Sequence, residues 1–285
     1  MSQPLQNPRQ QLTQFEVLPL ERSVELAEQL PQPERLTVTC SPRHGPDESV
    51  AIARRLTALG HDLTVHVAAR MVRGRAHLDE LLDGMGQAEA DLFLIGGDAT
   101  PPHGPWSSAV ALLPLVAEHP QRPSEIGIAG YPEGHPLIGS GTLADALEQK
   151  SALAGYITTQ LCFDPEALLA WLRDTRERGV TLPVLVGLPG VVSRRRLLEM
   201  SVRIGVGPSL SFLRKQRGLR KLLGPSTVTP DRVYDGLAPY LEDRELNIMG
   251  FHYYTFNQVV DTWKWEREKR EERDRSIPYE EAVTR

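Results

Sequence analysis

Cysteine is scarce in this chain, because only Cys40 and Cys162 occur among its 285 residues. Two distant cysteines cannot form the dense disulfide framework of a small secreted domain, nor do they show the spacing of zinc ligands. The eight histidines are scattered, and no pair has the H-x-x-x-H spacing that places two imidazoles on one helix face. The sequence therefore predicts neither a disulfide framework nor a metal site.

The chain also lacks an excess of positive charge and any long apolar run. Its 32 basic and 37 acidic residues give a net charge of -5, so no overall basic field attracts nucleic acid. No apolar run approaches the ~20 residues needed to cross a bilayer. The opening MSQPLQNPRQQLTQ has no apolar segment of the secretory kind. We expect a soluble, cytoplasmic protein that binds neither nucleic acid nor membranes.

Short apolar runs alternate with stretches of helical period along almost the whole chain. The expected strands are Phe15–Leu18, Leu36–Cys40, Leu63–Ala68, Asp91–Gly97, Glu125–Tyr131, Tyr156–Phe163, Pro183–Leu188 and Asn247–Tyr254. Repeated strand–helix units indicate a parallel sheet, because parallel neighbours need a crossover helix. Eight such units predict a single-domain α/β fold, the (β/α)8 TIM barrel. An open doubly wound sheet is the alternative, although the first strand lacks the usual G-x-G-x-x-G turn.

Two helices can be predicted in detail. In PDESVAIARRLTALG we expect Ala51, Leu56 and Leu59 to share one face. In DPEALLAWLRDTRERG, Asp164 is placed to cap the helix, Pro165 to begin it and Gly179 to close it. There the stripe of Leu168, Leu169 and Leu172 should face the sheet, while Arg173, Asp174, Arg176 and Glu177 face water.

The barrel is expected to span residues 14–260, after a flexible N-terminus (1–13) and before a charged C-terminal helix and tail (261–285). That helix should pack through Val259, Trp263 and Trp265. Its pairs Glu266–Arg270 and Glu271–Arg275 should contribute only a few tenths of a kcal/mol each. A segment from Gly207 to Thr229 is an insertion before the last helix–strand unit. Its basic residues, and those at 194–196, suit either a solvated surface or an anionic group of a ligand.

Polar residues at the carboxyl ends of the strands are candidates for an active site, since those ends form the mouth of a barrel. The candidates are Glu16, Thr39, His66, Asp98, Tyr131, Glu133, His135, Gln160, His252, Tyr254 and Asn257. Glu16 and Asp98 stand out, because a carboxyl group that faces the lumen loses hydration and can hold a proton near neutral pH. The alternative for each is a structural one, in which it pairs with a backbone amide or an arginine.

Six segments, in order along the chain, resemble one family. They are FEVLP, TVT, GGD, IAGYPEGHP, ITTQLCFD and GFHYYTFN. The methylenetetrahydrofolate reductases have FEFFPP, SVT, RGD, ACYPEGHP, ITQFFFD and HFYTLNR in the corresponding places. The resemblance runs from about Phe15 to Gln258 and implies a TIM barrel. The reaction that it implies is the reduction of 5,10-methylenetetrahydrofolate to 5-methyltetrahydrofolate, a step of one-carbon metabolism and methionine biosynthesis.

The resemblance also implies roles for individual residues. Glu16 corresponds to the family's general acid, which protonates the amine nitrogen that leaves when the folate ring opens to an iminium. Asp98, which we count as catalytic as well as substrate-binding, corresponds to an aspartate near the cofactor and the pterin, and Gln160 to a glutamine that contacts the pterin. We place Tyr254 with the substrate-binding residues. The positions of the flavin pocket correspond to Thr39, His66, Tyr131, His135 and Lys150.

The departures from the family concern the flavin. Gly96 stands where the family has arginine, and Leu143 and Ala146 stand where it has polar residues that grip the flavin ribityl and phosphate groups. A pyrophosphate needs donors or positive charge around it. We therefore expect FAD, the family cofactor, to bind weakly or not at all. NADH is the preferred hydride donor, with NADPH as the alternative, and direct transfer would give sequential kinetics.

Two other functions remain open at this point. One is a folate-dependent methyltransferase or demethylase that uses the same pterin cleft without hydride transfer. The other is a folate-binding protein without activity. The sequence does not indicate the oligomeric state.

Overall fold

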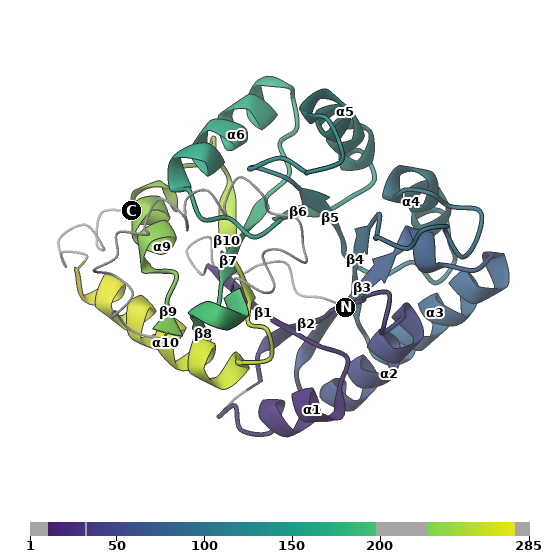
Figure 1. The fold of residues 1–285 in the computed structure, drawn as a ribbon, viewed down its shortest axis with the longest axis horizontal. Helices are drawn as coiled ribbons and strands as arrows, with labels where there is room; N and C mark the ends of the chain where they lie inside the picture. Colours follow the sequence, from purple (N-terminus) through teal and green to yellow (C-terminus); the bar gives the residue numbers. More distant parts are fainter. Residues whose placement is uncertain (1–10, 32, 198–226, 277–285) are drawn as a thin grey trace.

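Eight parallel strands close into a barrel in the computed structural model, which describes residues 11–31, 33–197 and 227–276. The order around the barrel is β1-β10-β7-β6-β5-β4-β3-β2, and β1 pairs with both β10 and β2. The ring is thus complete, which confirms the predicted TIM barrel and excludes the open sheet. Figure 1 looks into this ring, with the helices arranged around the strands.

All eight predicted strands are present. The barrel strands are β1 (Leu12–Val17), β2 (Arg35–Val38), β3 (Asp62–Ala68), β4 (Asp91–Ile95), β5 (Ile126–Gly130), β6 (Tyr156–Thr159), β7 (Val184–Pro189) and β10 (Ile248–Tyr254). The first strand begins at Leu12, three residues earlier than expected, because polar Thr13 and Gln14 hide the start of an otherwise apolar run.

A helix follows each barrel strand on the outside. The α-helices are α1 (Glu21–Ala27), α2 (Pro46–Thr57), α3 (Arg75–Gln87), α4 (Ala109–Ala117), α5 (Ser140–Ser151), α6 (Pro165–Glu177), α9 (Asp231–Leu237) and α10 (Val259–Ser276), with short 3-10 turns η1 (Ala69–Met71) and η3 (Ala238–Tyr240). Within the described ranges, no helix has the length and apolar character needed to cross a membrane.

Helix α6 confirms its predicted signals. The side chain of Asp164 accepts a hydrogen bond from the Glu166 amide, and Pro165 is the first helical residue. Leu168, Leu169 and Leu172 are buried, and Gly179 follows the helix with φ +84°. Arg176 differs from the prediction, because it is half-buried and donates to three backbone carbonyl groups.

The predicted face of α2 is wrong for two of its three residues. Leu56 is buried, but Ala51 and Leu59 are exposed. The buried stripe instead includes Ser49 and Ala53, which lie on the same face as Leu56 at helical spacing. Ser49 turns inward because its hydroxyl donates to the carbonyl oxygen of Thr39, at 2.6 Å.

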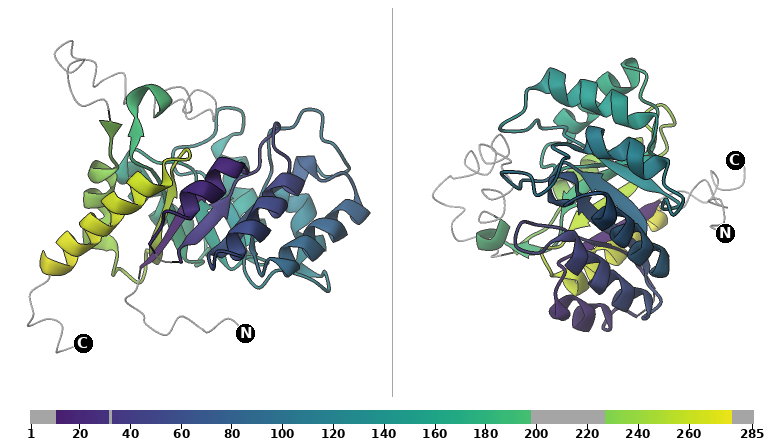
Figure 2. Two further views of the ribbon diagram at one scale, coloured as in Figure 1. Left: turned by 90° about the horizontal axis from the view of Figure 1, so that it is seen from below. Right: turned by 90° about the vertical axis from the view of Figure 1, so that its right-hand side faces the viewer.

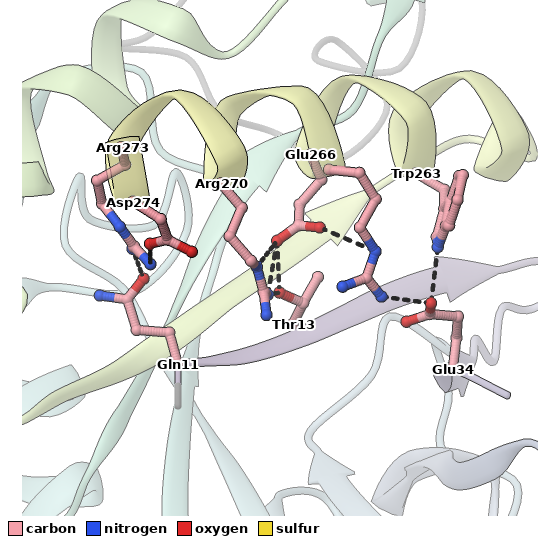
Figure 3. Close-up of polar contacts among 9 residues, drawn as sticks. Gln11, Thr13, Glu34, Trp263, Glu266, Arg270, Arg273 and Asp274 are labelled. Carbon is pink, nitrogen blue, oxygen red and sulfur yellow. Dashed lines mark hydrogen bonds and ion pairs between the residues drawn. The ribbon is translucent and has the colours of Figure 1, made fainter. Parts of the chain in front are cut away.

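Helix α10 packs against β1 through buried charge, which the sequence did not predict. Figure 3 shows Glu266 pointing from α10 toward Thr13 on β1. The Glu266 side chain is only 3% exposed; it accepts from Thr13 at 2.9 Å and pairs with Arg270 at 2.7 Å. The Glu266–Arg270 pair is therefore an interior contact rather than the solvated pair that was expected. A side-chain pair between Glu271 and Arg275 does not form, since Arg275 donates to the Glu271 carbonyl instead.

A two-stranded antiparallel sheet stands beyond the carboxyl end of β7. It consists of β8 (Val192–Ser193) and β9 (Thr227–Val228), and Figure 2 (left) shows it at the end of the barrel where β7 emerges. Of the expected insertion from Gly207 to Thr229, residues 207–226 lie outside the described residues. An apolar cluster joins this small sheet to the mouth and contains Leu161, Phe163, Val192, Leu197, Tyr254 and Phe256.

Candidate active site

The deepest acid of the mouth is Glu16, near the end of β1. It is 8% exposed and lies beside Tyr254 in the register between β1 and β10. Its Oε2 atom lies 3.5 Å from Nε2 of His252, which is fully buried two residues earlier on β10. The strand pairing thus brings together two titratable side chains that are far apart in the sequence.

A chain of hydrogen bonds holds His252 from its other nitrogen. Its Nδ1 atom lies 3.0 Å from Oε1 of Gln14, and Nε2 of Gln14 donates to Oγ1 of Thr64 on β3 at 2.8 Å. The three side chains lie inside the barrel, directly below Glu16. Sequence reasoning missed Gln14 and Thr64; their alternation with apolar residues was the available signal.

Tyr254 lies over this group with its hydroxyl turned away from Glu16. The hydroxyl donates to the carbonyl oxygen of Thr159 at 2.9 Å, and the ring meets His252 edge to face, with centroids 4.8 Å apart. Burial raises the pKa of Tyr254 well above its usual range, and the charge of Glu16 raises it further. The phenol is therefore neutral, and its ring packs against His252 at the position paired with Glu16.

Asp98 lies at the rim of the mouth rather than inside the lumen. It follows a turn in which Gly97 has φ +83° and in which a Cβ would come within 2.6 Å of the Cβ of Ala68. This turn carries Asp98 outward, so its side chain is exposed and the expected loss of hydration does not occur. Burial raises the pKa of Tyr131, and the charge of Asp98 raises it further.

The loop after β5 supplies three of the predicted residues. Tyr131 packs edge to face against His135, with centroids 5.6 Å apart, and His135 Nδ1 accepts from the Leu137 amide. Glu133 accepts from the amides of Phe163 and Asp164 and so braces the loop after β6. Asn257 has a similar bracing role, since its Oδ1 accepts from the Leu18 amide.

Gln160 begins the loop after β6, beside Tyr254. Its side-chain oxygen accepts from the Leu161 amide at 2.9 Å, and its own amide donates to Gly130 on β5. The side chain is half-buried, so its NH2 group is available to a ligand in the mouth.

His66 and Thr39 lie on neighbouring strands of the same interior. Burial and, to a smaller extent, the nearby His252 together lower the pKa of His66 to about 3, so the ring is neutral. Its ring is tilted against that of Phe93, with centroids 4.5 Å apart, and its Nε2 has no hydrogen-bond partner within the described residues. Thr39 is 8% exposed, and its amide donates to the Val17 carbonyl, which joins the ends of β1 and β2.

Lys150 does not reach the mouth as a free cation. Its side chain is 7% exposed, and Nζ donates to the carbonyl oxygen of Ala129 on β5 at 3.2 Å. Burial lowers its pKa to about 8. Arg70, the cation beside the Asp98 turn, donates to the carbonyl groups of Ala99 and Ser107. These residues therefore do not fit the flavin pyrophosphate, which requires donors or cations directed at it.

A cavity of about 380 Å³ lies outside the barrel interior, between α5, α6 and the end of β5. Of the predicted site residues its lining contains Tyr131 alone, and among its charged residues Arg178 pairs with both Glu148 and Asp174. It is therefore separate from the Glu16 group. The basic residues Arg214, Lys215, Arg217, Arg220 and Lys221 lie outside the described residues. Over the part of the chain that is described, no three side chains gather as metal ligands.

These features define a TIM barrel with a polar site at the carboxyl ends of its strands. Residues 90–206 match the family model for methylenetetrahydrofolate reductase. Over 82 residues the chain is 39% identical to a probable methylenetetrahydrofolate reductase (NADPH) of Caenorhabditis elegans, which is 27% of this chain and 12% of the relative. Over 87 residues it is 32% identical to methylenetetrahydrofolate reductase (NADH) 1 of Zea mays, again 27% of this chain and 15% of the relative.

One part of the chain, residues 90–206, is thus similar to the methylenetetrahydrofolate reductases. The aligned segments span less than a fifth of the length of those relatives. Among solved structures, dihydropteroate synthase of Thermus thermophilus is similar, with a TM-score of 0.44 and 14% identity over 91% of this chain and 94% of that chain. The spore cortex-lytic enzyme SleL of Bacillus megaterium has a TM-score of 0.46 and 10% identity, over 91% of this chain and 75% of that chain.

Proposed function

We propose that this protein is an oxidoreductase that reduces 5,10-methylenetetrahydrofolate to 5-methyltetrahydrofolate with hydride from NAD(P)H. The match of residues 90–206 to the family model supports the reaction class. The observation that carries the proposal is the place of Glu16, a buried acid at the barrel mouth beside a histidine. Because the relatives are named for NADPH in one case and NADH in another, either nucleotide suits the family, and we prefer NADH.

Glu16 acts as the general acid. It protonates the amine nitrogen that leaves as the five-membered ring opens, and the positive charge then rests on the iminium. A carboxyl group is suited to this step when water is kept from it, and the Tyr254 ring supports such an environment.

Asp98 and Gln160 bind and orient the pterin in this proposal. The exposed carboxylate of Asp98 accepts hydrogen bonds from pterin N–H groups, and the amide of Gln160 donates to a pterin oxygen or nitrogen. Thr39, His66, Tyr131 and His135 line the same mouth, where the nicotinamide would face the folate. Orientation of two bound reactants is then the main contribution of the protein beyond proton transfer.

We also propose that hydride passes directly from the nicotinamide to the iminium carbon, without FAD. The inward turn of Lys150, the apolar Leu143 and Ala146, and the absent side chain at Gly96 support this part. Direct transfer requires both reactants to be bound at once, so initial-rate patterns should intersect. A family of parallel double-reciprocal lines would contradict it.

The experiment combines the visible spectrum of the purified protein with an NADH oxidation assay, with and without added FAD. A colourless protein that oxidises NADH only in the presence of methylenetetrahydrofolate supports the proposal. Replacing Glu16 by Gln should lower kcat by a factor of about 10² or more, while Glu48→Gln on the exposed side of α2 should leave it unchanged. Flavin absorbance would overturn the flavin-free part, and near-normal turnover of Glu16→Gln would remove Glu16 from its role.

The same assay separates the other functions. A methyltransferase or demethylase would form methyltetrahydrofolate from a methyl donor without consuming NADH. A folate-binding protein would bind the substrate without turnover, and Glu16→Gln would bind it equally well.

A further inference from the structure

The two ring nitrogens of His252 meet two different acceptors inside the barrel. Nδ1 lies 3.0 Å from Oε1 of Gln14, whereas Nε2 faces Oε2 of Glu16 at 3.5 Å. The Gln14 amide is oriented by its own NH2 group, which donates to Thr64. Its oxygen must therefore accept from His252, so that Nδ1 of the histidine carries a hydrogen.

This tautomer leaves Nε2 of the neutral ring without a hydrogen. Nε2 and the carboxylate of Glu16 would then be two acceptors that face each other, and Nε2 has no hydrogen-bond partner within the described residues. A single additional proton resolves the conflict, whether it resides on Glu16 or on Nε2. With that proton the pair carries no net charge, and without it one negative charge is buried.

Other histidines of the same chain show the opposite arrangement. His77 and His119 are buried, and each faces an aspartate through Nε2, at 3.1 Å from Asp47 and 3.0 Å from Asp79. Their Nδ1 atoms accept backbone N–H groups, so that Nε2 carries the hydrogen and donates it to the carboxylate. Those two pairs need no further proton, whereas the His252–Glu16 pair does.

Within the part of the chain that the structure describes, the surroundings of the pair supply no compensating charge. Among the described residues, His66 on β3 and Tyr254 on β10 interact electrostatically with the pair, and Cys162 and Tyr131 interact with Tyr254. Burial holds His66 in its neutral form, and it raises the pKa values of Tyr254, Cys162 and Tyr131. Loss of the shared proton would therefore leave an uncompensated charge inside the barrel, which favours retention of the proton.

We propose that His252, oriented by Gln14, is a positioning residue that keeps on Glu16 the proton donated to the folate nitrogen. This inference rests on the proposed function, and it assigns the proton of the general acid to the pair formed by Glu16 and His252. Donation leaves a carboxylate beside a neutral His252, and its negative charge is balanced by the iminium that forms. Hydride from NAD(P)H then reduces the iminium carbon to the methyl group, and a proton from solvent restores the pair.

The first test reads the pair without any turnover. In protein labelled with ¹⁵N-histidine, NMR should show His252 with a protonated Nδ1. The Nε2 resonance of His252 should shift when Glu16 is replaced by Gln, while the resonances of His77 and His119 stay in place. A His252 ring with its hydrogen on Nε2 and a bare Nδ1 would overturn the proposal.

The second test compares two variants by their pH–rate profiles. In His252→Asn an amide N–H replaces Nδ1–H toward Gln14 but nothing replaces Nε2, and in His252→Gln the amide reaches toward Glu16 but cannot titrate. Both should move the alkaline limb of kcat to lower pH by about one unit, with little change in KM. His119 belongs to a buried histidine–carboxylate pair far from the mouth, so His119→Asn should leave the profile unchanged.

The outcomes separate the two proposals. An alkaline limb that does not move in a folded His252→Asn variant would overturn the role of His252, even if the enzyme is active. A wild-type protein without turnover would instead count against the proposed function, and the NMR result would still decide whether Glu16 and His252 share a proton.

Discussion

The ammonium group of Lys150 donates a hydrogen bond to the carbonyl oxygen of Ala129, at 3.2 Å, from the outer side of β5. The Lys150 side chain is therefore directed at β5. The family resemblance assigns this side chain to the flavin phosphates. The buried lysine carries a cost in stability, because burial lowers its pKa from 10.5 to about 8.

Replacing Lys150 by Met should therefore stabilise the fold at neutral pH. The lowered pKa corresponds to about 3 kcal/mol against the charged form, and part of the gain is offset by loss of the Ala129 contact, so we expect about 1–2 kcal/mol. The wild-type free energy of unfolding should rise as pH increases from about 8 to 10.5, because only the unfolded chain binds the proton there. Urea unfolding at several pH values measures both effects.

Lys264→Met, at an exposed position of α10, is the matched control and should show neither effect. Turnover of Lys150→Met should stay within a factor of about two of wild type, because the side chain does not reach the mouth of the barrel. A marked loss of nucleotide affinity in this variant would contradict the flavin-free account.

Glu266 should be important for stability but not for catalysis. Replacing it by Gln leaves Arg270 without its buried partner, and removal of one member of such a pair costs about 3 kcal/mol. Glu271→Gln, on the exposed side of the same helix, should change stability by less than about 0.5 kcal/mol. Thermal unfolding of the two variants decides this, and equal melting temperatures would show that the Glu266 contacts contribute nothing.

His66 should make the protein sensitive to acid. Its pKa is lowered from 6.5 to about 3, so the unfolded chain binds one more proton than the folded chain between these values. Stability should therefore fall as pH decreases through that window, and His66→Asn should reduce the slope by about one proton. Denaturant midpoints between neutral and acid pH give the slope. The exposed His103→Asn should retain the wild-type slope.

Gly187 leaves room for the Tyr254 ring. A Cβ at this position would lie 2.4 Å from the Thr159 carbonyl oxygen and 2.8 Å from the Tyr254 ring. Gly187→Ala should destabilise by about 1–3 kcal/mol and raise the KM for folate, because strand and ring must both shift. Gly86→Ala, where nothing lies within 4 Å in helix α3, should stabilise by about 0.5–1 kcal/mol. We expect the two substitutions to change the free energy of unfolding with opposite signs. A Gly187→Ala variant as stable as wild type would show that the Tyr254 ring can take another position.

The barrel could be predicted because its strands are nearly continuous apolar runs, and both faces of such strands are covered. The helix face was predicted well where large apolar residues define it, as in Leu168 and Leu172 of α6. It was predicted wrongly in α2, since a buried Ser49 is stabilised by a carbonyl group that the sequence pattern does not reveal. For the same reason Glu266 was expected at the surface, although Thr13 and Arg270 satisfy it in the interior.

The site was predictable only in part. Strand ends and the family resemblance pointed to Glu16, Asp98 and Gln160, but not to the exposure of Asp98, which depends on the turn at Gly97. The contact between Glu16 and His252 depends on the register of β1 against β10, which joins the two ends of the barrel. The two-residue strands β8 and β9 are too short to leave a pattern in the sequence.

The transfer of deuterium from labelled NADH tests the central claim most directly. Flavin-free protein would be given methylenetetrahydrofolate and NADH that carries deuterium at the transferred position, and the product would be analysed by mass spectrometry. We predict one deuterium in each new methyl group, since direct transfer gives the label no opportunity to exchange with water. A methyl group without deuterium, or formation of product only after FAD is added, would contradict the account.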